Sequence, residues 1–418
     1  MIEDRQSEQP PPPTGAGRQR GVRVFRLYAA LAFSFAWVPV MYTAFVLERG
    51  FSPGDYARLW SVYYAVMVLA ELPWGWLADR WGPRPLLAAG PLLLAGAFCV
   101  LGRASEFNTC LLAMGLTGAA HAMISGADSA WLYDFIQAQG RSGDALHEEA
   151  AAHRWRLLGV CLADVAGGVV AFFLSTRAAF DLAALLMLGA ALAARCLPAS
   201  GPRRARASTT ASLQPTRLLS DLRRPGVAWC LAWFALVFVL LRVGFQLYQP
   251  TLLEQGVASL WQHGLVFGLL NLLAGLAAFG VRPVHDRLGE VGSALAVLVM
   301  LGVAFLGLGL GPAWWLLPML AIQQVSFSFL QPLGRTALNR RVPSRDRAWL
   351  LSVQSVGGRL AFAAVLWSVD AELALGDLPR SYAGLALAAL LGALLLGLTA
   401  PRRVGAAAGG KLESPADG

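Results

Sequence analysis

Five charged side chains lie inside long apolar segments of this sequence: Glu71, Asp128, Asp164, Arg242 and Arg359. A charge at the centre of a lipid bilayer costs about 2.5 to 3.5 kcal/mol on insertion scales, so such residues face a protein interior or a water-filled cavity. An acid in a cavity that alternately hydrates and dries can gain and lose a proton, and an arginine there can attract an anion. These residue types therefore predict proton coupling, anion binding or static ion pairing within a membrane.

Asp164 is the first candidate for proton coupling. At a rise of 1.5 Å per residue it lies about 15 Å from the end of its predicted helix, close to the bilayer midplane. Asp128 and Glu71 are the further candidates. Static pairing is the competing interpretation, because Glu71 and Arg359 fall at similar estimated depths. Arg242 and Arg359 are candidates for attracting an anionic substrate or for pairing with Glu71 or Asp164.

Two predicted helices also carry polar side chains at helical spacing, which places the members of each set on one face. The first set is Thr117, His121, Ser125 and Asp128. The second is Gln324, Ser328, Gln331 and Arg335. These stripes, with Tyr42 and Tyr248, predict the walls of a substrate cavity. Small-residue packing with a local hydrogen bond is an alternative for Thr117, Ser125 and Ser328, as is a packed neutral histidine for His121.

Membrane helices must position these side chains. The chain has 418 residues, of which 56% are hydrophobic and 14% charged, against about 25% charged in soluble domains. This composition excludes a disordered chain, a disulfide-rich secreted scaffold and an ordinary soluble enzyme. Spans of about 20 apolar residues predict an all-α membrane protein with twelve transmembrane helices, near residues 27–47, 58–78, 85–102, 108–134, 155–175, 179–197, 226–252, 260–281, 291–311, 313–333, 348–369 and 381–400.

The longest gap between predicted helices divides the chain into two six-helix bundles. The expected organisation is a disordered tail at 1–22, a bundle at 23–197, a linker at 198–225, a second bundle at 226–400 and a tail at 401–418. On one predicted side of the membrane lie 27 of the 34 Lys and Arg residues, against 5 on the other. Because basic residues favour the cytoplasmic side, we expect both termini and the linker in the cytoplasm and the protein in the plasma membrane. The net charge of +9 has the same explanation, so nucleic-acid binding is not expected.

The two halves repeat each other. Tyr42, Glu48 and Gly50 after the first predicted helix recur 206 residues later as Tyr248, Glu254 and Gly256. The segment Asp79-Arg80-Trp81-Gly82 recurs 207 residues later as Asp286-Arg287-Leu288-Gly289. The two matches have nearly the same offset and lie at equivalent places in the two halves, which indicates duplication. Such duplication is common in transporters that bind their substrate between the repeats.

Residues 75–84 read Gly75-Trp76-Leu77-Ala78-Asp79-Arg80-Trp81-Gly82-Pro83-Arg84. This stretch resembles the signature between helices 2 and 3 of the major facilitator superfamily, with Pro83 where the family usually has a basic residue. The resemblance implies two pseudo-symmetric bundles, alternating access and a central pathway lined by helices 1, 4, 7 and 10. It also implies a conformational latch formed by Gly75, Asp79, Arg80, Gly82 and Arg84, with Asp134 as the acid that Arg84 meets and Asp286, Arg287 and Gly289 as the second copy.

A fainter resemblance lies in the fifth predicted helix. Ala163-Asp164-Val165-Ala166-Gly167-Gly168 is similar to the antiporter signature of the drug-exporting branch, with Asp164 in place of its proline. We therefore expect a secondary active transporter that exports a small molecule in exchange for protons. Uptake or exchange of an organic anion is the first alternative. A lipid-modifying membrane enzyme using His121 and the acids, or a sensor without transport activity, are the others.

The remaining expectations concern partners. The protein is expected to be a monomer in the lipid bilayer, with a small-molecule substrate and protons as its ligands and no enzymatic activity. No cofactor or metal is expected, because the five cysteines lack the close pairs of a metal or redox site. Several tryptophans at predicted helix ends are interpreted as interface anchors: Trp60, Trp261, Trp314, Trp315, Trp76 and Trp81.

Overall fold

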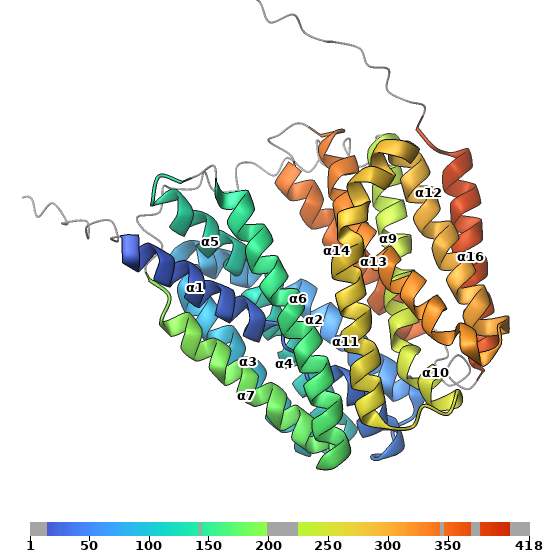
Figure 1. The fold of residues 1–418 in the computed structure, drawn as a ribbon, viewed down its shortest axis with the longest axis horizontal. Coiled ribbons are helices and arrows are strands. Elements are labelled where there is room, and N and C mark those ends of the chain that lie inside the picture. Colours follow the sequence, from blue (N-terminus) through green and yellow to red (C-terminus); the bar gives the residue numbers. More distant parts are fainter. Residues whose placement is uncertain (1–14, 142–143, 199–224, 343–346, 369–376, 402–418) are drawn as a thin grey trace, which may run out of the picture.

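The structure is a computed structural model that describes residues 15–141, 144–198, 225–342, 347–368 and 377–401. In these residues all regular secondary structure is helical. The helices form two bundles, one on each side of residues 199–224 in sequence, which stand side by side (Figure 1). The all-α membrane fold is confirmed. Most of the expected linker and of both tails lies outside the described residues.

The first bundle contains α1 (Gly15–Ala32), η1 (Val38–Val40), η2 (Thr43–Leu47), α2 (Pro53–Trp81), α3 (Pro83–Arg103), α4 (Phe107–Ile124), α5 (Ala127–Gln137), α6 (Ala145–Phe173) and α7 (Thr176–Arg195). The second contains α9 (Pro225–Gln246), α10 (Tyr248–Glu254), α11 (Leu260–Ala277), η4 (Ala278–Gly280), α12 (Val281–Leu310), η5 (Ala313–Trp315), α13 (Leu316–Asn339), α14 (Arg347–Ser368) and α16 (Leu378–Leu398). Each predicted span corresponds to between one and three of these elements.

Nine helical segments of the described chain are long and apolar enough to cross a membrane. One of them, Leu260–Leu310, is 51 residues long and comprises two predicted spans. The first two predicted spans are not among the nine. In the structure the first is interrupted, and the second, α2, contains Glu71 and many aromatic residues.

The first and seventh predicted spans are both broken. Between Ala32 and Val38 the chain leaves the helix, and Pro39 follows in η1. The seventh span changes from α9 to α10 at Leu247, three residues before Pro250. A proline lacks the N–H that would bond the carbonyl four residues earlier, so a continuous helix is disfavoured at both places. The first span also begins earlier than expected, since α1 starts at Gly15, inside the expected tail.

The fourth predicted span is broken as well, which was not expected. Helix α4 ends at Ile124, and α5 begins at Ala127 after Gly126, whose φ is +84°. Such a left-handed conformation suits glycine because it has no Cβ atom. The predicted stripe Thr117 to Asp128 assumed one straight helix, so Asp128 lies beyond the break.

The repeat seen in the sequence extends to backbone conformation. Gly50 and Gly256 have φ values of +71° and +79°, and Gly82 and Gly289 have +85° and +71°. Gly82 ends α2 and precedes α3, and Gly289 forms a kink within α12. The equivalent glycines therefore turn the chain in the same way in both bundles.

Two helix pairs join the bundles. Helix α6 packs against α11, and α2 packs against α14. In the first pair the backbones approach closely. A Cβ atom added to Gly264 would lie 2.5 Å from the backbone oxygen of Asp164 and 2.9 Å from Cα of Gly168. In the second pair, Ser61 donates a hydrogen bond of 2.8 Å to the carbonyl oxygen of Ala363.

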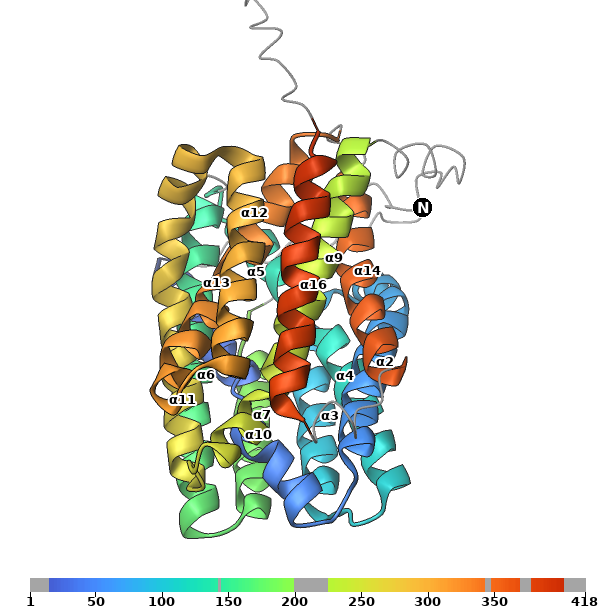
Figure 2. The ribbon, with the colours of Figure 1, turned by 90° about the vertical axis from the view of Figure 1, so that its right-hand side faces the viewer.

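A further contact joins the bundles near α10, at the end opposite to the start of α9 (Figure 2). The buried side chain of Gln249 donates to the carbonyl oxygen of Val38 at 2.7 Å and accepts from the backbone N–H of Tyr42 at 2.6 Å. One side chain of the second bundle thus satisfies backbone groups at the broken first span. We call this pair of bonds the Gln249 clamp.

Candidate substrate site

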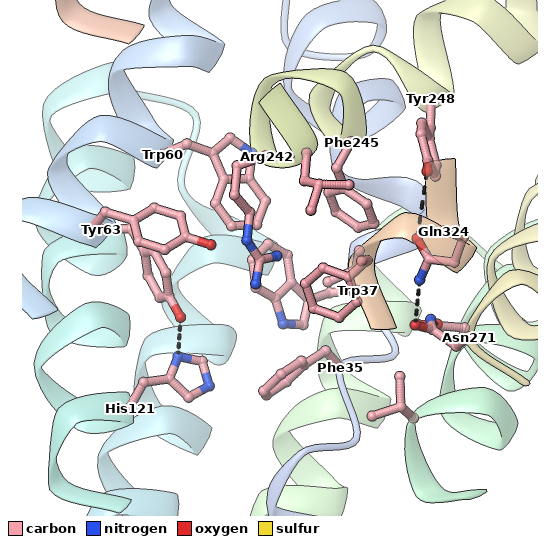
Figure 3. Close-up of a pocket in the computed structure, with 16 residues that line it drawn as sticks. Phe35, Trp37, Trp60, Tyr63, His121, Arg242, Phe245, Tyr248, Asn271 and Gln324 are labelled. Atoms are coloured by element: carbon pink, nitrogen blue, oxygen red, sulfur yellow. Dashed lines mark hydrogen bonds between the residues drawn. The ribbon is translucent and has the colours of Figure 1, made fainter. Parts of the chain in front are cut away.

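A cavity of about 210 Å³ lies between the two bundles. The broken first and seventh spans contribute to it, since irregular backbone at membrane depth is tolerated where it lines a cavity. The first bundle supplies Phe35, Trp37, Val38, Trp60, Tyr63, Tyr64, His121, Val160 and Asp164. The second supplies Leu241, Arg242, Phe245, Tyr248, Asn271, Gln324 and Phe327. Figure 3 shows these side chains pointing toward a common space.

Asp164 forms one end of a hydrogen-bond chain that crosses between the bundles. Asn271 Nδ2 donates to Asp164 Oδ2 at 2.8 Å. Gln324 Nε2 donates to Asn271 Oδ1 at 3.2 Å, and the Tyr248 hydroxyl lies 3.5 Å from Gln324 Oε1 as its donor. Every donor in the chain is directed toward the carboxylate of Asp164. Its carboxylate is therefore held by the opposite bundle through a neutral amide.

The residue Asp164 is only 2% exposed. Within the part of the chain that the structure describes, no basic side chain lies within ion-pair distance of it. A buried carboxylate without a cation is costly when ionised, so such a group tends to be found where its protonation can change. This environment distinguishes Asp164 from the other membrane acids.

Arg242 enters the cavity from α9. Its guanidinium carbon lies 5.9, 5.5 and 5.3 Å from the ring centres of Tyr64, Phe238 and Phe327, which is within the range of cation–π attraction. Among the described residues it has no carboxylate partner, and its Nε atom is buried without a hydrogen bond. The cavity thus contains a cation that is surrounded by aromatic rings.

His121 lies on the opposite bundle. Its Nδ1 atom is 2.9 Å from the Tyr63 hydroxyl, and Phe35 packs edge-on against its ring at 4.8 Å between centres. The Nε2 atom is buried and has no partner in the described structure. Figure 3 shows His121 below Arg242, with Tyr63 between them on the left.

The other predicted charges form ion pairs outside the cavity. Arg359 on α14 pairs with Glu71 on α2, across the interface between the bundles. Arg156 on α6 pairs with Asp128 at 2.5 Å within the first bundle. Asp128 also accepts the backbone N–H of Ser129 at 2.8 Å. Each of these acids therefore has a compensating cation.

Of the predicted cavity side chains, His121, Tyr248 and Gln324 line the cavity and the others do not. The hydroxyl groups of Thr117 and Ser328 donate to the carbonyl oxygens of Ala113 and Val325 in their own helices. Three further residues lie elsewhere: Ser125 at the helix break, Gln331 exposed on α13, and Tyr42 at the Gln249 clamp.

The signature residues lie around the junction of α2 and α3. Asp79 is exposed at the end of α2, and the guanidinium of Arg80 lies 5.6 Å from the Trp76 ring centre. Arg84 donates to the carbonyl oxygen of Arg195 at the end of α7, at 2.7 Å. Residues 343–346, which precede α14 in the sequence, lie outside the described residues.

The remaining members of the predicted latch occupy similar surface positions. Asp134 is half-buried on α5, and Gly75 is exposed on α2. In the second copy, Asp286 lies 3.7 Å from Arg282 in an exposed i,i+4 pair, and Arg287 is exposed. The two copies therefore share backbone geometry at Gly82 and Gly289 but have different side-chain contacts.

Sequence reasoning missed most of the aromatic lining and Asn271. Trp60 was interpreted as an interface anchor, but it is 7% exposed and lines the cavity. By contrast, Trp314 is 73% exposed, as an anchor should be. The available signal for Asn271 was a lone amide in the apolar run Leu269-Leu270-Asn271-Leu272-Leu273, which marks a polar contact within a membrane protein.

Two bundles around a mixed polar and aromatic cavity define a membrane transporter fold. Residues 24–366 match the family model of the Major Facilitator Superfamily, and the chain belongs to this family. No curated protein matches the sequence.

Solved transporter structures share the fold. A mutant of the nucleoside transporter NupG superposes with a TM-score of 0.81 at 12% identity, covering 91% of this chain and 100% of that one. A mutant of the peptide transporter POT gives 0.72 at 15%, covering 92% and 94%. A bacterial homolog of the human lysosomal transporter Spinster, in an inward-facing unoccupied conformation, gives 0.67 at 14%, covering 93% and 96%. The protein is a multi-pass membrane transporter of this family.

Proposed function

We propose that the protein exports a small molecule across the plasma membrane in exchange for protons, with Asp164 as the proton-binding group. The observation that carries this proposal is the position of Asp164. It is a buried acid of the central cavity whose only described side-chain partner is the amide of Asn271 on the other bundle. Glu71 and Asp128, which have arginine partners, are the weaker candidates.

The geometry gives a physical route to coupling. The bond between Asp164 and Asn271 joins the two bundles, so movement of one bundle against the other changes the groups around the carboxylate. An ionised carboxylate needs hydrogen-bond donors such as the Asn271 amide. A protonated carboxyl group is neutral, so keeping it in a dry environment costs less free energy. Proton binding and bundle movement are then linked, because each changes the free energy of the other.

Export is supported by the glycine pair next to Asp164, which is similar to the antiporter signature of the drug-exporting branch. Gly168 packs closely on the backbone of α11, and the preceding Gly167 packs on Ala36 of the first span. These contacts place the glycine pair of α6 against α11 and against the break in the first span. The distribution of basic residues supports cytoplasmic termini. Export then means movement of the solute from the side of the termini to the opposite side.

Transport in vesicles with an imposed pH gradient tests the proposal. Purified protein is reconstituted, and candidate solutes are screened for gradient-driven movement. We expect Asp164→Asn to abolish gradient-driven accumulation while solute exchange without a gradient continues. Asp128→Asn is the matched control, because it removes an equivalent charge from a paired site. Retention of full coupling in Asp164→Asn would show that the proton binds elsewhere.

Uptake or exchange of an organic anion is a second candidate, favoured by one observation. Arg242 lines the cavity without a carboxylate partner among the described residues. An anionic solute would supply that partner, and its movement would follow the opposite pH gradient if it entered together with a proton. The direction of the pH dependence in the same vesicles separates the two functions.

We also propose that the signature residues act as a latch between conformations. Asp79 lies near the end of α2, and this helix packs against α14 of the other bundle. Asp79→Asn is expected to slow turnover and leave solute binding intact. Unchanged turnover would mean that the signature serves only to orient this loop.

A further inference from the structure

We propose that the cavity binds a planar aromatic carboxylate, with its acidic group at Arg242 and a second polar group at His121. This inference rests on the proposed transport function and names the substrate class of the same cavity.

The acidic group is inferred from Arg242. Its guanidinium lies among three aromatic rings, within the described residues it has no carboxylate within ion-pair distance, and its Nε is buried and unpaired. A buried donor without an acceptor is unfavourable, so an acceptor is expected when the cavity is filled. The planar fork of arginine matches a carboxylate in a bidentate arrangement.

The ring is inferred from the walls. Eight of the sixteen lining residues are Phe, Trp or Tyr, and they come from both bundles. Aromatic rings pair favourably with another aromatic ring in stacked or edge-to-face arrangements, and Trp37 and Phe35 lie between Arg242 and the lower part of the cavity in Figure 3. An aliphatic anion would gain burial here but not these ring contacts.

The second polar group is inferred from His121. His121 lines the cavity. Its Nδ1 atom is already engaged by Tyr63, while Nε2 is buried and has no partner in the described structure. A hydroxyl or carbonyl group on the ring, distant from the carboxylate, would satisfy it. Because Arg242 and His121 belong to different bundles, such a solute would contact both of them at once.

The size of the cavity limits the solute further. Its volume of about 210 Å³ is below the range of about 300 to 1,000 Å³ that is typical of sites for drug-sized ligands. A single substituted ring is therefore the expected size. The small volume also favours a carboxylate over a bulkier phosphate as the acidic group.

Equilibrium binding to the purified full-length protein, measured by calorimetry at one fixed pH, tests this inference without any variant. The probes are 4-hydroxybenzoate, benzoate, benzamide and cyclohexanecarboxylate. We expect benzoate to bind about 10-fold or more tightly than benzamide, which lacks the charge. We expect it to bind about 3- to 10-fold more tightly than cyclohexanecarboxylate, which lacks the aromatic ring. Equal binding in either comparison, or no binding of benzoate, would overturn the inference.

Variants assign the two contacts. Arg242→Gln should weaken benzoate binding about 10-fold or more, and Arg242→Lys should weaken it less. Arg103→Gln, which removes an exposed arginine that does not line the cavity, is the control for the lost charge and should bind as the wild type does. The wild-type protein should bind 4-hydroxybenzoate more tightly than benzoate, and His121→Phe should abolish that preference. Equal binding of the two probes by the wild-type protein would contradict the second contact. A preference that persists in His121→Phe would contradict the assignment of the second contact.

The outcome is independent of the proton assignment. Binding at one pH requires neither a gradient nor turnover, so failure of the probes would reject the substrate class and leave the Asp164 experiment intact. Loss of coupling in Asp164→Asn, together with the expected order of probe affinities in the wild-type protein, would support both proposals. Retained coupling in Asp164→Asn, with the same order of affinities in the wild-type protein, would reject only the proton site.

Discussion

The two helix pairs that join the bundles differ in the partner that each gives to its acid. Between α2 and α14, Glu71 and Arg359 neutralise each other as an ion pair. Between α6 and α11, Asp164 faces the neutral amide of Asn271. In an ion pair the cation stabilises the ionised form of the acid. A buried acid bonded only to an amide has no cation to keep it ionised. The difference suggests that the first interface holds the bundles together and the second responds to a ligand or proton.

The largest effect on stability is expected from breaking the ion pair. Arg359→Gln leaves Glu71 partly buried without a cation and should lower the free energy of unfolding by about 2 to 3 kcal/mol. This is less than for a fully buried pair, because the Glu71 side chain is 26% exposed. Thermal unfolding of the purified protein measures the loss. The double variant Glu71→Gln/Arg359→Gln should recover most of it, and a double variant as unstable as the single one would argue against pairing.

A smaller loss is expected from separating the other helix pair. Gly264→Ala places a Cβ atom against the backbone of α6 on two sides, and backbone atoms cannot move aside easily. Overpacking of this kind costs about 1 to 3 kcal/mol. Gly275→Ala on the same helix is the control, since its Cβ would meet only the side chain of Leu157. Equal unfolding temperatures for the two variants would show that the close approach at Gly264 is unimportant.

The smallest change in stability is expected at Asn271, although coupling should suffer. Asn271→Leu removes the hydrogen bond to Asp164, which contributes about 1 kcal/mol, and should lower the number of protons moved per solute. Gln354→Leu removes a comparable buried bond within the second bundle, to the carbonyl oxygen of Gly334. It should cost similar stability and leave the proton-to-solute ratio unchanged. If both variants alter the ratio alike, the cross-bundle bond has no special role.

The fold could be predicted almost entirely from the sequence. Membrane spans need long apolar runs, and the longest gap between these runs gives the grouping into two bundles. Helix breaks were harder to anticipate. The break at Ser125 depends on a left-handed glycine at position 126, and glycine is common in membrane helices without any break. Because the polar stripe was extended through this break, Asp128 was placed with the cavity residues.

The candidate site could be predicted only in part. A charged residue in an apolar run is conspicuous, so Asp164 and Arg242 were found. Their partners were not. Similar depth indicated the pair of Glu71 and Arg359, but depth alone does not select one neighbour when several helices face the same cavity. Aromatic residues such as Trp60 and Tyr63 were missed because membrane proteins use the same side chains at the lipid interface.

Infrared difference spectroscopy of the carboxyl groups tests the central claim most directly, because it reports the protonation of acids in the purified protein without transport. Titration of the wild-type protein across the pH range of transport should reveal a carboxylic acid band that appears and disappears. Our account predicts that this band is absent from Asp164→Asn and retained in Glu71→Gln and Asp128→Asn. A band that persists in Asp164→Asn and is lost from one of the other two variants would contradict it.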